Sequence, residues 1–322
     1  MLIDPCKRMF LYFVVFAILW MPVTLQSVTK RSFLAKPSCD DRISNIEFVA
    51  EHQAPSRHSC AAMCDINCGC FGFNSLVKKC RIHRSCILVN MTSTEDGWRY
   101  YQISAPQDCQ GVMETGERTS GLYVIDPFGG RQRLVTVYCD MDTDNGGWTA
   151  IQRRLSGTMN FNNTWTEFKN GFGDPASAYW IGNDVIHHLT NRQPHFLYVN
   201  FKLNNGSIFH QKYEYFSIGD ESTNYTLHLG GPTTGNLGDS MINTVYFGAN
   251  LNGMSFSTVD RDNDQWSTGY CAAAYNGGWW FNRCVYAFLN GPWPPEYWEY
   301  PWHPTIKSVS NITEVRMMIK PT

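Results

Sequence analysis

The pattern of apolar and polar positions first separates the start of the chain from the rest. Residues 9–21 form an uninterrupted apolar run that follows Lys7 and Arg8. A helix that spans a bilayer needs about 20 apolar residues, so this run is too short for a comfortable span. A basic start followed by a short apolar run is typical of a secretory signal peptide, which we place at residues 1–27. An uncleaved signal anchor is the alternative.

After a linker at residues 28–38, a short amphipathic segment precedes two strand-like runs. Cys60 and Cys64 are four residues apart, so both would lie on one face of a short helix that Ser56 or Ser59 would cap. The following runs, CFGFNS and KKCRI, read as strands. We therefore expect a small α+β unit in which a helix lies against a sheet.

Cross-links would hold that helix to the strands. We expect a disulfide between Cys60 and Cys80, and a second one from Cys64 to Cys70 or to Cys68. Clustered cysteines can also bind a metal, but these spacings are not those of a zinc ribbon, and an exported chain is oxidised rather than metallated.

Further along, the pattern changes to longer alternating runs. Residues 138–154 read YCDMDTDNGGWTAIQRR, which predicts a strand, a turn at Asn145-Gly146-Gly147 and a second strand. Cysteine density falls at the same time: residues 39–86 contain seven cysteines, and the rest of the chain from Cys109 only four. Small domains need cross-links because their cores are thin. We therefore place one domain at 39–104 and another at 108–322.

Composition narrows the classes of function. The chain has a formal net charge of -2, with 17% charged and 14% aromatic residues, so it offers no basic stripe for nucleic acid. Of the twelve cysteines, Cys6 lies in the signal peptide, and the remaining odd number predicts one unpaired or intermolecular thiol. Asn-x-Ser/Thr sequons predict glycosylation at Asn90, Asn162, Asn205, Asn224 and Asn311.

Two families are similar to the two segments. The helix with Cys-x3-Cys and the CFGFN strand resemble a PAN/apple-type domain, a resemblance that implies binding of proteins or glycans. The second segment closely resembles the fibrinogen C-terminal domain, found in ficolins, tachylectin-type lectins, angiopoietins, tenascins and fibrinogen chains. Its motifs appear in order as YCDMDTDNGGWTAIQRR, GGPTTGNLGDS, DRDNDQWSTGYC and GGWWFNRCVYAFLNGPW. This resemblance implies an α+β globe with a central antiparallel sheet and the disulfides Cys109–Cys139 and Cys271–Cys284.

The segment DRDNDQWSTGYC predicts a calcium site. It is not an EF-hand, because the sixth residue counted from Asp260 is Gln265, where a glycine is needed, and the twelfth is Cys271, where a glutamate is needed. The resemblance assigns the ligands as the carboxylates of Asp262 and Asp264, then backbone carbonyls. These carbonyls would come from Trp266 and from Thr268 or Gly269. We expect Asp260 to orient the loop; the alternative for the whole segment is a solvated polar loop.

The same resemblance implies a ligand pocket beside that loop. Tyr275 matches a pocket tyrosine, and the backbone of Asn282, Arg283 and Cys284 matches the segment that donates to an acetyl oxygen, in some members through a cis peptide before the cysteine. The following residue is commonly histidine in sugar- and peptide-binding members, and here it is Val285, which cannot donate a hydrogen bond. This difference leaves the ligand open.

Aromatic residues in PWPPEYWEYPWH could replace the lost contact. Tyr297 and Trp298 are the candidates, since aromatic faces stack on sugars and on cations. The alternative is that they pack within the loop. The fibrinogen-like resemblance gives Trp279 and Trp280 a structural place instead, so we expect at least one of them to be buried.

No catalytic motif is present: the sequence has no HExxH, no Gly-x-Ser-x-Gly and no phosphate-binding loop. We therefore expect no enzyme. The prediction is a secreted, calcium-dependent lectin for acetylated or related glycans, acting in innate recognition, with a disulfide-linked oligomer as a further expectation. The alternative is a matrix or receptor-binding ligand of the angiopoietin or tenascin type, which binds protein instead of sugar.

Overall fold

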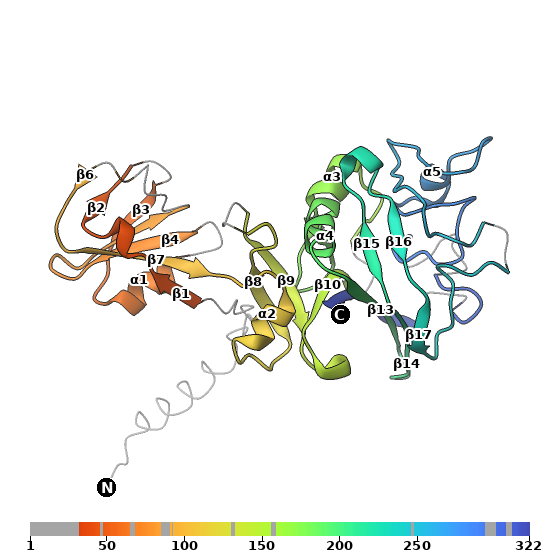
Figure 1. The fold of residues 1–322 in the computed structure, drawn as a ribbon, viewed down its shortest axis with the longest axis horizontal. Helices are drawn as coiled ribbons and strands as arrows, with labels where there is room; N and C mark the ends of the chain where they lie inside the picture. Colours follow the sequence, from red (N-terminus) through yellow and green to blue (C-terminus); the bar gives the residue numbers. More distant parts are fainter. Residues whose placement is uncertain are drawn as a thin grey trace, which may run out of the picture.

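The computed structural model describes residues 32–45, 48–64, 68–84, 91, 93–129, 133–155, 159–245, 248–293, 301–306 and 311–322. The proposed signal peptide lies outside these ranges. Within them, no helix is both long enough and apolar enough to cross a membrane. The described chain forms two units, one up to residue 104 and the other from residue 105 onward, and Figure 1 shows each with its own sheet.

The first unit is a five-stranded antiparallel sheet covered by one helix. The strand order is β1-β7-β4-β5-β3, with β1 at Ser32–Ala35, β7 at Trp98–Ser104, β4 at Cys70–Asn74, β5 at Lys79–His83 and β3 at Phe48–Gln53. A short ladder pairs β2 (Arg42–Ile43) with β6 (Ser93–Thr94), and a 3-10 turn, η2, covers Pro37–Cys39. Helix α1 (Arg57–Met63) begins at Ser56, whose side chain accepts the Ser59 N–H at 3.1 Å.

Alternation along β4 separates the small sheet into two buried faces. Phe71 and Phe73 lie in the cluster that includes Cys60 and Cys64 of the helix segment. Cys70, one residue earlier, lies in the opposite cluster with Trp98. Successive strand side chains point to opposite faces, so the two clusters are the two sides of one sheet.

This alternation decides the disulfides of the helix. Cys60 is bonded to Cys80, and Cys64 is bonded to Cys68. The prediction of Cys64–Cys70 was wrong, and its alternative Cys64–Cys68 is what the structure shows. Cys70 has a different disulfide partner and belongs to the other face of the sheet, out of reach of Cys64.

The second unit has a nine-stranded antiparallel sheet with its chain end inside it. The main order is β11-β12-β10-β18-β13-β14-β17, and β9 pairs with both β8 and β10. Strand β18, Ile312–Pro321, lies between β10, Trp148–Leu155, and β13, His195–Leu203. The other strands are β8 (Gly121–Ile125), β9 (Val135–Asp140), β11 (Phe172–Gly173), β12 (Tyr179–Trp180), β14 (Ile208–Tyr213) and β17 (Pro232–Gly235), and a separate hairpin pairs β15 (Phe216–Ile218) with β16 (Leu227–Leu229).

Helices and long loops complete this unit. The helices are α2 (Cys109–Glu114), α3 (Trp165–Asn170), α4 (Asn183–Thr190) and α5 (Cys271–Tyr275), with 3-10 turns η4 at Thr143–Asn145 and η5 at Glu221–Thr223. The predicted turn after β9 needs Gly146: its φ is +71°, and an added Cβ would lie 2.6 Å from the Met141 carbonyl oxygen. Among the described residues between β17 and β18, the chain forms one helix, α5, and otherwise loops joined by isolated β-bridges.

Aromatic side chains join those loops to the sheet. Trp180 of β12, Phe256 and Trp280 have ring centroids 5.1–6.1 Å apart, and all are fully or almost fully buried. Trp279 and Trp280 are both 0% exposed, which confirms the expectation that at least one is buried. The loop carrying residues 256–281 is therefore packed into the main core.

Candidate functional site

The acidic loop is held in place by its first residues. Asp260 accepts hydrogen bonds at 2.8 Å from the backbone N–H of Trp165, the first residue of α3, and at 2.7 Å from the Thr258 hydroxyl. The next residue, Arg261, donates to the Asn224 side chain at 2.6 Å and lies 3.9 Å from the centre of the Trp165 ring. These contacts fix the start of the loop against α3.

The two central carboxylates lie together. The backbone N–H of Asp264 donates to the Asp262 carboxylate at 3.2 Å, and Asp262 is exposed while Asp264 is half-buried. The Asp264 oxygens accept the N–H groups of Trp266 and Cys271, each at 2.7 Å. Burial raises the pKa of Asp264, and the neighbouring Asp262 charge adds to this rise. Two neighbouring carboxylates of like charge disfavour the state in which both are ionised.

The turn after Asp264 presents backbone carbonyls. Gly269 donates to the Trp266 carbonyl at 3.1 Å, which closes a tight turn. A side chain at position 269 would not fit, because its Cβ would lie 2.2 Å from the Trp266 indole. Thr268, in the middle of the turn, is exposed. The described residues contain no group of three or more acidic, histidine or cysteine side chains suited to a metal, so any ion here would need these carbonyls and water.

The segment around the second cysteine connects to this loop directly. The Gln265 N–H donates to the Asn282 carbonyl at 3.0 Å, and the disulfide Cys271–Cys284 closes the same region. The Asn282 side chain donates to the Asn250 carbonyl at 2.8 Å. Acidic loop, bridge and segment 282–284 thus form one connected unit.

A family of known proteins matches the whole second unit of the fold, including the acidic loop and segment 282–284. Residues 105–322 match the family model described as the C-terminal globular domain of fibrinogen beta and gamma chains. The chain belongs to this family. We therefore call residues 105–322 the fibrinogen-like globe.

Individual relatives are similar to the chain over the fibrinogen-like globe. The chain is 41% identical to fibrinogen-like protein A of Apostichopus parvimensis over 61% of its length, and 42% identical to ryncolin-4 of Cerberus rynchops over 58%. It is 38% identical to dog angiopoietin-2 over 59%. The aligned stretch spans 70% of fibrinogen-like protein A, 51% of ryncolin-4 and 37% of angiopoietin-2.

Two solved structures share the fold. The fibrinogen-like globe domain of human ANGPTL6 has a TM-score of 0.60 and 34% identity, and the match covers 68% of this chain and 96% of that one. Lamprey fibrin D-dimer, complexed with the peptide ligand Gly-His-Arg-Pro-amide, has a TM-score of 0.59 and 30% identity over 67% of this chain and 74% of that one.

The residues expected around the ligand pocket of the globe have mixed positions. Tyr275 is half-buried, and its ring stacks on Phe281 with centroids 6.3 Å apart. Arg283 is exposed, and Val285 is half-buried against the main core. The Asn282 N–H donates to the Cys284 carbonyl at 3.0 Å, so this amide is already used. Val285 packs its apolar side chain against the core at this position.

The cis peptide and the aromatic residues expected at the pocket have different outcomes. A cis peptide before Cys284 is not found: among described residues the cis bond is His303–Pro304. Tyr297 and Trp298 lie outside the described residues. Trp302, from the same aromatic run, is fully buried and donates to the Gly238 carbonyl at 2.7 Å, so it is a core residue.

The sequons of the globe differ in exposure. Asn205 and Asn311 are exposed, while Asn162 and Asn224 are half-buried and make side-chain hydrogen bonds. Asn90 lies outside the described residues. The remaining cross-link of the globe joins Cys109 to Cys139 and ties α2 to β9.

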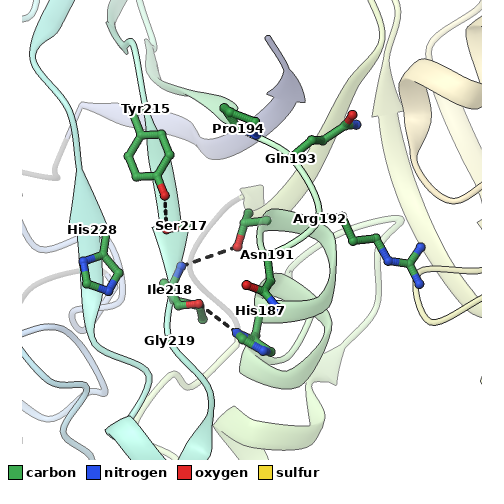
Figure 2. Close-up of a pocket in the computed structure, with 11 residues that line it drawn as sticks. His187, Asn191, Arg192, Gln193, Pro194, Tyr215, Ser217, Ile218, Gly219 and His228 are labelled. Atoms are coloured by element: carbon green, nitrogen blue, oxygen red, sulfur yellow. Dashed lines mark hydrogen bonds between the residues drawn. The ribbon is translucent and has the colours of Figure 1, made fainter.

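The globe also has a polar cleft that the sequence did not predict. It has a volume of about 410 Å³ and lies between the end of α4 with the following loop and the β15–β16 hairpin (Figure 2). His187 donates from Nδ1 to the Ile218 carbonyl at 2.9 Å. No motif indicated this cleft, because its walls come from segments about 20 to 40 residues apart that only the fold brings together.

Proposed function

We propose that the fibrinogen-like globe is a calcium-dependent recognition module. The observation that carries this proposal is the double link between loop and pocket segment: Asp264 accepts the Cys271 N–H, and Gln265 donates to the Asn282 carbonyl. Through these two bonds a change in the acidic loop would reach the backbone around the Cys271–Cys284 bridge.

The oxygen atoms of the loop are of the kind that binds calcium. Calcium takes six to eight oxygen ligands at about 2.3–2.6 Å, from carboxylates, carbonyls and water. Asp262 and Asp264 would hold the ion with the carbonyl of Trp266 and that of Thr268 or Gly269. The ion would supply positive charge that offsets the repulsion between the two carboxylates. The chain itself orients the segment 282–284 and excludes water beneath it by burying Phe281.

For the ligand, we propose acetylated or related glycans. Support comes from the half-buried Tyr275, whose ring stacks on the buried Phe281 and offers an amphipathic aromatic face suited to an acetyl group or a sugar. One shallow pocket binds weakly, so several linked globes would be needed, and linkage raises apparent affinity by about 10² or more. The role would be recognition of decorated surfaces in innate defence.

The second candidate is binding of a protein or peptide. Val285 favours it, because an apolar residue beside the pocket suits a hydrophobic side chain better than a hydroxyl group. The lamprey fibrin relative is complexed with a peptide ligand, and other relatives are angiopoietins. In this form the same loop would hold the receptor-binding surface.

For the first unit, we propose a PAN/apple-like adhesion or assembly domain. Support comes from a single helix pinned to an antiparallel sheet by Cys60–Cys80. Secretion of the whole chain is supported by four disulfides among the described residues, since such bonds persist in oxidising compartments. Cys39 is fully buried, so a disulfide-linked oligomer would have to use a different cysteine.

Capture on immobilised N-acetylglucosamine tests the function. The full chain should bind in millimolar calcium and elute with EDTA. Asp262→Ala with Asp264→Ala should abolish capture, whereas Glu95→Ala with Asp96→Ala, which removes the same charge from an exposed loop of the first unit, should not. Retention that ignores EDTA would contradict the calcium dependence. No retention, together with binding to an apolar peptide column, would favour the second candidate.

A further inference from the structure

The cleft between α4 and the β15–β16 hairpin has two walls with different chemistry. Ser217 and His228 are paired across the hairpin, so their side chains share one face, and Tyr215 lies on that face two residues before Ser217. On the opposite wall are His187 and Asn191, from the last turn of α4 and the residue after it (Figure 2). The volume of about 410 Å³ is within the range of about 300–1,000 Å³ usual for small-molecule sites.

The walls are fixed by internal hydrogen bonds. The Thr190 hydroxyl accepts the Ile218 N–H at 3.4 Å and donates to the Ile186 carbonyl at 2.8 Å. Together with the bond from His187 to Ile218, these contacts tie α4 to β15 along the floor of the cleft. The cleft is thus a preformed feature of the globe, which lowers the cost of ordering it around a ligand.

Several polar atoms remain available at the walls. Because His187 donates from Nδ1, its Nε2 is an acceptor in the neutral ring. Neither the ring of His228 nor the side-chain amide of Asn191 has a hydrogen-bond partner among described residues, and both are exposed. Tyr215 is 38% exposed, and its hydroxyl shares a 2.9 Å hydrogen bond with Ser217.

The residues that line the cleft carry little formal charge. The only charged residue along it is Arg192, which donates to the Phe128 carbonyl at 2.8 Å and points away in Figure 2. Asp220 is near His187, but its carboxylate accepts from Ser222 at 2.6 Å and from Thr223 at 3.2 Å, and it does not line the cleft. A cation would therefore find no carboxylate among the lining residues, and an anion would find only Arg192, whose guanidinium is directed away from the cleft.

We propose that this cleft is a second, calcium-independent site for a neutral pyranose unit of a glycan. An exposed tyrosine face suits the C–H surface of a sugar ring, and the neutral donors and acceptors of His187, His228 and Asn191 suit its hydroxyl groups. The site shares no residue with the acidic loop. It would give one globe two points of contact with a glycan surface and so raise avidity within a single chain.

Saturation-transfer difference NMR on the full chain in EDTA tests this proposal. The probe is a mixture of the methyl glycosides of glucose, galactose, mannose and N-acetylglucosamine. Transfer to at least one glycoside is expected. His228→Ala and Tyr215→Ala should each lower it by about fivefold. Asn191→Trp, at an exposed position, should fill the cleft and remove it without disturbing the core.

His188→Ala is the matched control, because His188 is exposed on the same helix but its ring lies 4.3 Å from that of Phe128 and does not line the cleft. It should leave transfer unchanged. Absence of transfer to all four glycosides, or equal transfer in the Asn191→Trp variant, would overturn the proposal. Binding that needs calcium and is lost in Asp262→Ala with Asp264→Ala would overturn the second site and leave the proposed function standing.

Discussion

The small sheet of residues 32–104 buries its side chains in two separate clusters, whereas the fibrinogen-like globe buries them in one cluster that includes residues from most of its strands and loops. Of the eight buried residues in the cluster beneath α1, four are disulfide-bonded cysteines. The core of the globe instead contains large apolar side chains such as Trp180, Trp279 and Trp280. Covalent bonds thus replace apolar volume in the small unit.

The size of each core determines how much irregular structure the unit can support. The globe has enough core to hold long loops without regular structure, including the acidic loop at 260–270. The small unit has no such reserve, so its bridges maintain the fold itself. Leu134 of the globe packs on the small unit's cluster, so the two are in contact without sharing a core.

The largest expected effect is in the globe core. Trp280→Ala removes a fully buried ring that contacts Trp180 and Phe256 and donates to the Tyr225 carbonyl at 2.8 Å. It should lower the free energy of unfolding of the globe by about 3–5 kcal/mol. Denaturant-dependent hydrogen exchange in β13 and β18 measures this loss. Trp293→Ala, at a half-buried position, is the control and should cost clearly less.

The second effect compares matched cross-links. Cys60→Ala with Cys80→Ala should remove about 2–5 kcal/mol and unfold the small unit, since this bridge joins α1 to β5 over a core of only eight buried residues. Cys109→Ala with Cys139→Ala removes a similar cross-link from the globe, which should stay folded with a lower midpoint. Exchange of the β4 and β5 amides reports the first, and of the β10 amides the second. A small unit that remains protected without its bridge would contradict the comparison.

The smallest effect is a pH dependence of the globe. Burial lowers the pKa of His195, although its bond to the Gln193 carbonyl opposes this. The unfolded chain therefore binds a proton more readily, so stability is complete above the ordinary histidine pKa of about 6.5 and falls as the pH drops below it. His195→Asn, which can keep the donor to Gln193, should flatten the slope between pH 7 and 5. Urea midpoints at each pH measure it; an unchanged slope would exclude His195 as the cause.

Local patterns were enough to predict part of this molecule. The helix at Cys60, the strands at CFGFNS and KKCRI, the turn at Asn145-Gly146-Gly147 and the burial of the Trp279–Trp280 pair follow from spacing, turn chemistry or family resemblance. The partner of Cys64 was harder, because two cysteines were close enough in sequence. Only the face of β4 on which Cys70 lies excludes it.

The site was harder to predict than the fold. The acidic residues are local in sequence, but their link to Asn282 runs through the backbone of Gln265, which no side-chain pattern can indicate. The cleft near α4 depends on β15 and β16 meeting the end of that helix. Contacts between distant segments and hydrogen bonds of the main chain are set by the tertiary fold, and so they were not visible in the sequence.

The central claim is that the acidic loop and the pocket segment respond to calcium together. Hydrogen exchange of the full chain, with and without millimolar calcium, tests it most directly at the amides of Gln265 and Cys271 and across residues 279–284. Calcium should slow exchange at all of these in the native chain and at none of them in the Asp262→Ala, Asp264→Ala variant. Slowing confined to the acidic loop, or equal slowing in the variant, would contradict the claim.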